Sequence, residues 1–469
     1  MQKALSLCSL AAAALALCVF QAGAQIASGD TLTAPPVLTD RSPAPDTVEV
    51  VLTAEPARLS LLPGVQTEGW AYNGSVPGPT LEVREGDRVI VRFRNNLPEE
   101  TTVHWHGLHL PFAADGSPFH PVAPGGEHTY AFTVPPGAAG TYLYHPHPHH
   151  RTAWQMGMGL YGAVIIRAAD DPLSHLAERL LILSDNRFRP DGSIDFPDPH
   201  SAQGRIDEEN GREGNVLFVN GRVLPTIPVR NGEVQRWRVI NASGARVYRL
   251  SLPGHSLLHV GSDGGLFERP VGVEEITLAN TERAELLVRG TGAPGSRSAL
   301  QALPYDRYTA LARPDDWEET RELLTLQYTG EATVAATPIP DRLRAIPALN
   351  PLHATATRVI RMAQGRLNSK TMDLTRVDER APLGATEIWE VRNLVGMDHP
   401  FHLHGFSFQV LDRNGVPEPF RSWKDTVNVP KHQTVRFIVR YDDHPGKWMF
   451  HCHILEHEDQ GMMGVLEVR

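Results

Sequence analysis

Short runs in which apolar and polar residues alternate recur along the whole chain, and turns rich in Gly, Pro and Asn separate them. Residues 89–95 (Val-Ile-Val-Arg-Phe-Arg-Asn) are one example. Alternation places successive side chains on opposite faces of an extended segment, so each run predicts a strand with one buried face. Closely spaced strands of this kind are typical of sandwiches and Greek-key barrels. The pattern therefore predicts an all-β fold.

The pattern itself is repeated. A turn, a strand, a second turn and a second strand that ends at Asn occur at 73–95, at 220–241 and, less closely, at 368–393. A period of about 150 residues is far longer than a solenoid repeat, so it predicts three copies of one β-domain. We expect these domains at 45–168, 173–335 and 352–469. A Pro-rich linker precedes the third domain, and the charged segment 186–215 is predicted to be an exposed excursion.

Composition and charge narrow the class of protein. The chain has 469 residues, of which 41% are hydrophobic and 21% charged, as in soluble globular proteins. Its 40 Gly and 38 Pro fit many short strands better than long helices. A net charge of −10 without a basic stripe excludes nucleic acid as a partner. Only the N-terminus has an apolar run of membrane length, so we expect no membrane span in the mature chain, and we expect a monomer.

The N-terminus has the features of a secretory signal peptide at residues 1–24. Lys3 precedes an apolar run at 4–20, and Ala-Gly-Ala at 22–24 is a small-residue cleavage site. Its removal takes two of the three cysteines away and leaves Cys452 as the only one. We therefore expect an exported protein, periplasmic or secreted, that is not held together by disulfides.

Four clusters of histidine stand out from this background. They are His104-Trp-His106, His145-Pro-His147, His399-Pro-Phe-His402-Leu-His404 and His451-Cys452-His453-Ile-Leu-Glu-His457. Two histidines separated by one residue lie on the same face of a strand, as a shared metal site requires. The middle repeat has no such pair and serves as an internal control. The clusters therefore predict a metal site between the outer domains, with the second domain as a spacer.

Cys452 lies between two of these histidines and faces the opposite side of the predicted strand. Two His, one Cys and a weak axial Met form the ligand set that selects copper for electron transfer. His457 and Met462 follow Cys452 closely enough to belong to such a set. One short strand then reaches a copper on one face and a second metal site on the other, which provides a covalent path for electrons.

In this order, the four motifs resemble those of three-domain multicopper oxidases, above all bacterial laccases and cuprous oxidases. The resemblance spans about residues 45–469, and all twelve expected ligand positions are filled. It implies three cupredoxin-like Greek-key β-sandwich domains. It also implies four copper ions per chain, namely one type 1, one type 2 and a type 3 pair. The implied reaction is one-electron oxidation of a small donor coupled to four-electron reduction of O₂ to water.

The resemblance assigns the copper ligands residue by residue. His399, Cys452 and His457 would bind the type 1 copper with Met462 axial, and His104 and His402 would bind the type 2 copper. The type 3 pair would be held by His106, His145, His147, His404, His451 and His453. Two alternatives stay open: His149 as one of the copper ligands within the run 145–150, and Met463 in place of Met462 as the axial ligand.

Electrons and protons need separate routes in such an enzyme. We expect a donor to pass electrons to the type 1 copper through an exposed ring edge of His399 or His457. Asp115 and Glu458 match positions that relay protons in similar enzymes, and Asp459 is a weaker candidate. A purely structural role in orienting metal ligands is the alternative for these carboxylates.

The identity of the donor is less strongly indicated. An axial Met lowers the type 1 potential relative to an apolar side chain, which favours easily oxidised donors such as methoxyphenols or Cu⁺. Cuprous oxidases carry a Met-rich insert, whereas only Met362, Met372 and Met397 precede the last ligand segment here, so phenols are favoured. Asp398 is a candidate donor contact.

Three other functions remain as alternatives. Metal-ion oxidation for copper detoxification would use the same sites. A copper nitrite reductase would need two domains and no type 3 histidine pairs. A non-catalytic copper-binding cupredoxin protein would have lost ligands, and none is lost here.

Overall fold

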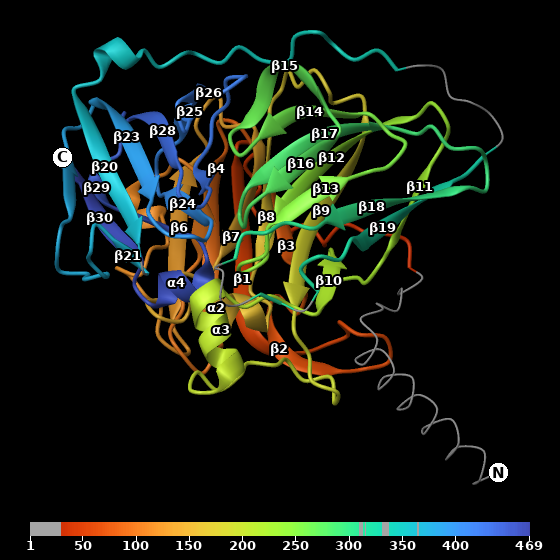
Figure 1. Ribbon diagram of the computed structural model, residues 1–469, viewed down its shortest axis with the longest axis horizontal. Coiled ribbons are helices and arrows are strands. Elements are labelled where there is room, and N and C mark those ends of the chain that lie inside the picture. Colours follow the sequence, from red (N-terminus) through yellow and green to blue (C-terminus); the bar gives the residue numbers. More distant parts are fainter. Residues whose placement is uncertain (1–29, 309–312, 315, 331–336, 364) are drawn as a thin grey trace.

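The structure, a computed structural model, describes residues 30–308, 313–314, 316–330, 337–363 and 365–469. The predicted signal peptide lies outside these residues. The described strands form six sheets in three pairs (Figure 1), which confirms the predicted all-β class. Within the described ranges, no helix has the length and apolar character needed to cross a membrane.

The strands follow one another in three groups along the chain. The first group is β1 (Thr47–Leu59), β2 (Thr67–Tyr72), β3 (Gly78–Arg84), β4 (Arg88–Asn95), β5 (His104–His106), β6 (Glu127–Thr133), β7 (Gly140–His145) and β8 (Gly162–Arg167). The second is β9 (Ala177–Asn186), β10 (Val216–Val219), β11 (Thr226–Val229), β12 (Val234–Asn241), β13 (Tyr248–Ser251), β14 (Leu257–Ser262), β15 (Gly265–Val273), β16 (Glu275–Leu278), β17 (Arg283–Arg289), β18 (Arg297–Leu303) and β19 (Arg321–Tyr328). The third is β20 (Ala356–Ala363), β21 (Arg366–Leu367), β22 (Glu379–Ala381), β23 (Thr386–Asn393), β24 (His399–Leu403), β25 (Phe408–Arg413), β26 (Val416–Pro417), β27 (Thr426–Val429), β28 (Thr434–Arg440), β29 (Gly446–Cys452) and β30 (Met463–Val468).

Each group builds two sheets that enclose a core of their own. The sheet orders are β2-β1-β4-β6 with β3-β8-β7-β5, β10-β9-β12-β17-β14-β15 with β11-β19-β18-β13-β16, and β21-β20-β23-β28-β25-β26 with β22-β30-β29-β24-β27. The three cores contain the buried Trp105, Trp237 and Trp389 respectively. Strands β1 and β4, β9 and β12, and β20 and β23 pair in parallel. This crossed connectivity, repeated three times, is that of cupredoxin-like sandwiches.

Equivalent asparagines make the threefold repeat visible at the level of side chains. Asn95, Asn241 and Asn393 end β4, β12 and β23, and each is buried. Each carboxamide accepts a hydrogen bond from the backbone N–H two residues later and donates to two backbone carbonyls. The turn asparagines that open the three repeats have nearly the same positive φ, 49°, 51° and 49° at Asn73, Asn220 and Asn368. The same local geometry at equivalent positions indicates three copies of one fold.

Three short helices, one from each strand group, meet at one end of the molecule (Figure 1). They are α2 (Thr152–Met158), α3 (Ala202–Asn210) and α4 (Leu455–Asp459), and α4 contacts both of the others. Helix α3 lies within segment 186–215, which the sequence predicted to be exposed. That prediction is wrong in part, because α3 packs on α4 and leaves Asn210, Arg212 and Glu213 buried.

The Pro-rich linker crosses the opposite end of the molecule, at the top of Figure 1. Residues 337–350 form neither helix nor strand there. The 3-10 turn η2 (Pro351–His353) follows the linker, and a second 3-10 turn, η1 (Phe112–Ala114), lies in the first strand group. The fold thus separates the linker from the helical end, where α4 with His457 is located.

Candidate metal centre

Eight histidines from the first and third strand groups converge between those two sandwiches. In β5 and β7, His104 stands opposite His145, and in β24 and β29, His402 stands opposite His451. Rings from the two groups stack directly, since the centroids of His104 and His404 are 4.0 Å apart and those of His106 and His402 are 3.8 Å apart. None of the eight is more than 1% exposed. The eight-histidine cluster consists of His104, His106, His145, His147, His402, His404, His451 and His453.

Most rings of the cluster use Nδ1 for a hydrogen bond to a group outside the cluster. The Nδ1 atoms of His104 and His402 lie 2.8 Å from the backbone oxygens of Asp115 and Asp425. The Nδ1 atoms of His145 and His451 likewise contact the carbonyls of the next residue, at 2.9 and 3.0 Å. Because a carbonyl only accepts, each of these Nδ1 atoms carries the proton and each Nε2 is a bare lone pair. These rings therefore present Nε2 to the interior.

His106 is turned the other way. Its Nε2 lies 3.0 Å from Oδ1 of Asp425, a carboxylate that accepts the proton. The bare atom is therefore Nδ1, and it lies 3.3 Å from Nε2 of His145. Within the cluster, His106 thus offers Nδ1 where its neighbours offer Nε2.

Bare nitrogens in the cluster face one another or have no partner. Nε2 of His451 lies 3.0 Å from Nε2 of His404 and 3.3 Å from Nε2 of His147. The Nε2 atoms of His104, His402 and His453 are buried without a hydrogen-bond partner. Facing lone pairs repel, and a buried unpartnered nitrogen costs desolvation energy. Cations held among these atoms would satisfy them together, so the donor set fits metal ions.

Protonation does not relieve these contacts. Burial first, and then the neighbouring imidazoles, lowers the pKa of His402 and of His404 well below the usual range. Burial lowers the pKa of His451 to about 3. These three rings are therefore neutral at physiological pH, which is the form that binds metals.

The cysteine site (His399, Cys452, His457 and Met462) lies on the other face of β29. The ligand atoms of His399, Cys452 and His457 lie within 4.8 Å of one another, and Sγ of Cys452 is 3.7 Å from Nδ1 of His457. Nε2 of His457 donates to the carbonyl of Glu209 at 2.8 Å, so its bare Nδ1 faces the sulfur. Nδ1 of His399 is buried without a partner. Burial raises the pKa of the Cys452 thiol, so a thiolate there requires a cation beside it.

The pairing of β29 with β30 distinguishes the two candidate methionines. Met463 stands opposite His451, and side chains of directly paired residues lie on the same face of a sheet. Met463 therefore lies on the side of the eight-histidine cluster. Met462 belongs to the same apolar core as Cys452, and its carbonyl accepts the N–H of Cys452 at 3.1 Å. This placement favours Met462 for the cysteine site.

Within the run 145–150, the structure also distinguishes the ligand pair His145 and His147 from an alternative that uses His149. His145 and His147 are in the cluster, whereas His149 is only half-buried and packs on His150, with ring centroids 3.6 Å apart. The geometry favours His145 and His147.

The three candidate carboxylates lie in different settings. Asp115 is buried, and its Oδ2 accepts from Nδ1 of His404 at 3.0 Å. Glu458 is buried, with its carboxyl oxygens 3.3 to 3.4 Å from Nδ1 of His451 and of His147, and burial raises its pKa well above the usual range. Asp459 instead accepts the backbone N–H groups of residues 152 and 153 at the start of α2. Asp459 thus caps the start of α2, while Asp115 and Glu458 contact the cluster.

Two expectations about donor access are wrong. His399 and His457 are 2% and 4% exposed, so neither offers an exposed ring edge, and α3 covers His457 through the carbonyl of Glu209. Asp398 is also buried. Its carboxylate accepts hydrogen bonds from Tyr305, from Asn428 and from the backbone of Lys431, so it is engaged within the protein rather than exposed to a donor.

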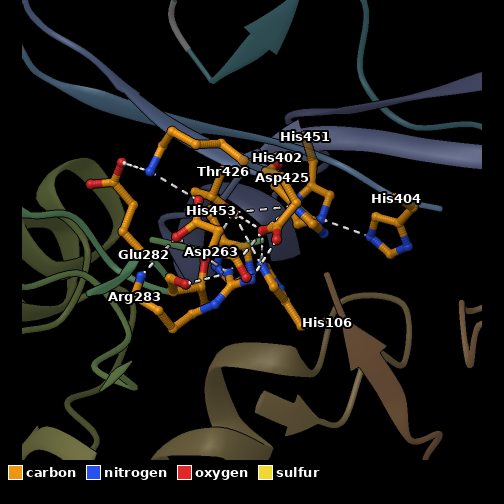
Figure 2. Close-up of polar contacts among 12 residues, drawn as sticks. His106, Asp263, Glu282, Arg283, His402, His404, Asp425, Thr426, His451 and His453 are labelled. Carbon is orange, nitrogen blue, oxygen red and sulfur yellow. Dashed lines mark hydrogen bonds and ion pairs between the residues drawn. The ribbon is translucent and has the colours of Figure 1, made fainter. Parts of the chain in front are cut away.

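Sequence reasoning missed the residues that surround the eight-histidine cluster. Asp425 binds both His106 and His402, and Arg283 pairs with Asp425 (Figure 2). Asn280 donates to the backbone oxygen of His453. Arg283 and Asn280 belong to the second strand group, so that group is more than the predicted spacer. The place of Asp425 beside β27 becomes visible only in the structure, where β27 pairs with the histidine strand β24.

Comparisons with known proteins agree along most of the chain. Three family profiles, each described as multicopper oxidase, match residues 53–171, 189–330 and 345–469. The multicopper oxidase mco of Staphylococcus aureus is 31% identical, and the match covers 89% of this chain and 88% of that protein. A laccase of Bacillus subtilis (strain 168) is 29% identical, with 86% and 90% covered. The structure of a Campylobacter jejuni multicopper oxidase, described as a metallo-oxidase, matches with a TM-score of 0.86 and 34% identity over 95% of this chain and 96% of that one.

Proposed function

The chain belongs to the multicopper oxidase family and is a laccase-like oxidoreductase, and on this premise we propose that it binds four coppers and oxidises small phenolic donors with O₂. Copper, when bound, supplies one-electron redox chemistry at the cysteine site and reduction of O₂ to water at the eight-histidine cluster. The observation that carries the proposal is the presence of both sites on opposite faces of one strand, joined through Cys452.

We assign the ligands as the family resemblance implies. The type 1 ligands are His399, Cys452, His457 and axial Met462, and the type 2 ligands are His104 and His402. The type 3 ligands are His106, His145, His147, His404, His451 and His453. The bare, inward-facing nitrogens support these assignments.

The chain's own groups orient these ligands and hold protons. Asp115 fixes His404 through its carboxylate and His104 through its backbone oxygen. Glu458 holds a proton at a carboxyl oxygen beside His147 and His451, because burial raises its pKa. We propose that both carboxyls pass protons to the eight-histidine cluster, whose burial keeps bulk water out.

Methionine exposure supports an organic donor over Cu⁺. All methionines in the described ranges are buried or half-buried, and Met362 and Met397 are in the core of the third sandwich. A thioether-lined surface for gathering Cu⁺ is therefore absent from the part of the chain that the structure describes. The burial of these methionine side chains fits a role in packing the hydrophobic cores.

The proposed function is tested by copper analysis combined with oxygen uptake. We expect about four coppers per chain, a blue colour from the thiolate–copper bond, and O₂ consumption with 2,6-dimethoxyphenol that exceeds that with Cu⁺. Faster turnover of Cu⁺ would favour metal-ion oxidation. A colourless, copper-saturated chain that consumes no O₂ with either donor would overturn the proposal.

We further propose that the protein is exported to the periplasm or beyond and acts as a monomer. The apolar run and small-residue site at 1–24 support export. N-terminal sequencing of the secreted fraction and sedimentation analysis test the two statements. A mature chain that still begins at Met1, or a sedimenting dimer, would contradict them.

Replacing Met462 by Leu is expected to raise the reduction potential of the cysteine site, because an apolar group takes the place of the weak axial thioether. Redox titration of the blue colour measures the shift. Met463→Leu is the matched control, since Met463 faces the other side of the sheet. A shift in Met463→Leu alone would transfer the axial role to Met463.

A further inference from the structure

Arg283, from the second sandwich, uses every one of its N–H groups at the meeting point of the three sandwiches. Its Nε donates to the backbone oxygen of Thr141 in β7, at 3.1 Å. Nη1 donates to the oxygen of Thr281 at 2.9 Å, and Nη2 donates to that of Asp263 at 3.0 Å. The remaining two donors form a fork with the carboxylate of Asp425, at 2.9 and 2.5 Å. A guanidinium has five N–H donors, so none is left over.

Asp425 in turn touches two ligands of the eight-histidine cluster. Its Oδ1 takes the Nε2 proton of His106 at 3.0 Å, and its backbone oxygen takes the Nδ1 proton of His402 at 2.8 Å. Figure 2 shows this chain of contacts running from Arg283 through Asp425 to the two rings. A shift of Asp425 would therefore displace one ring from each outer sandwich.

Little space is available for Asp425 to move. Gly107, which follows His106, has a φ of 86°, and a Cβ there would lie 2.4 Å from Oδ2 of Asp425 and 2.6 Å from Nη2 of Arg283. The neighbouring residue Lys424 is anchored to Asp263 at 2.9 Å and to Glu282 at 3.2 Å, which fixes the chain beside Asp425. The carboxylate thus lies against Gly107 and Arg283, on a segment whose neighbouring side chain is also tied down.

We propose that Arg283 is a positioning residue that fixes Asp425 and thereby holds His106 in the tautomer that presents Nδ1 to the metals. Without the fork, Asp425 loses both charged contacts and keeps, among the described residues, only the Thr426 hydroxyl and His106 as hydrogen-bond partners, at Oδ1. His106 can then place its proton on Nδ1, where it blocks metal binding. This inference rests on the proposed function. It gives the second sandwich a role in the metal centre although that sandwich supplies none of the assigned ligands.

The test compares three variants of the copper-loaded full chain. Arg283→Gln removes the charge and most donors, and Arg283→Lys keeps the charge but cannot form the five-donor fork. Arg238→Lys is the matched control, because Arg238 is equally buried in the second sandwich and also reaches the first, at Thr141, but pairs with Glu178 and Glu285 instead of Asp425. The readouts are chelator titration of bound copper, electron paramagnetic resonance of the cluster coppers, and the blue colour.

We expect both Arg283 variants to stay blue but to lose cluster copper at an about 10-fold lower chelator concentration than the wild type, with an altered resonance spectrum. Arg283→Lys should lie between Arg283→Gln and the wild type, and it decides the question if Arg283→Gln does not fold. Unchanged copper retention and spectrum in Arg283→Lys overturn the positioning role, as does an equal loss in Arg238→Lys. A wild-type chain that binds no copper overturns the proposed function instead.

Discussion

Replacing Cys452 by Ser is expected to abolish the blue colour and donor oxidation together, while the eight-histidine cluster keeps its copper. The blue colour comes from a thiolate–copper bond, and a hydroxyl does not supply one. His451 and His453 point to the other face of the strand, so their contacts do not depend on the sulfur. Copper analysis should therefore fall from about four to about three ions per chain, and O₂ uptake with 2,6-dimethoxyphenol should fall to background.

Phe450→Leu is the matched control for that experiment. Phe450 lies two residues before Cys452 on β29 and in the same core, so its replacement perturbs packing on the same face without removing a ligand. We expect this variant to stay blue and active. Survival of the blue colour in Cys452→Ser would mean that the type 1 assignment is wrong.

The sequence predicted the parts of the centre that depend on local periodicity. His104 and His106 lie on one face of β5 while Trp105 enters the core of the first sandwich, as strict alternation requires. The same rule separated Cys452 from its flanking histidines. The repeat of turn and strand likewise revealed the three sandwiches, because Asn95 and its two counterparts make the same local hydrogen bonds.

Contacts between distant positions could not be predicted in this way. His106 and Asp425 are 319 positions apart, and Arg283 and Asp425 are 142 apart. A single Asp or Arg in a charged sequence carries no period that marks it as buried. Only the docking of the three sandwiches brings these residues together, and no pattern within one strand encodes that docking.

The misjudged segment 186–215 has a similar cause. Its Asp, Arg and Gly residues have the composition of an exposed loop, yet its charges are paired: Arg187 with Asp207 inside the segment, and Glu213 with Arg307 outside it. Pairing lets charged residues be buried. The segment consequently packs as α3 on α4, and the carbonyl of Glu209 in α3 accepts from Nε2 of His457.

Replacing Asp115 by Asn is expected to slow reduction of O₂ by about 10- to 100-fold, the usual effect of changing a group that contacts a metal ligand, while the blue colour is retained. The amide oxygen of Asn can still accept from Nδ1 of His404, and the backbone oxygen at position 115 still holds His104. What Asn lacks is the capacity to take up and release a proton. Asp115→Ala removes the acceptor as well, so copper loss in Ala but not in Asn would separate orientation of His404 from proton delivery.

The measurement is the return of the blue colour after anaerobic reduction and mixing with O₂, alongside its bleaching by the donor. Bleaching should occur at the wild-type rate in Asp115→Asn, because the cysteine site is unchanged, whereas the return of colour should be slow. Asp443→Asn is the control, since that carboxylate pairs with His109 at 2.6 Å, outside the eight-histidine cluster. A wild-type rate of colour return in Asp115→Asn would remove Asp115 from the proton path and leave it only the role of orienting His404.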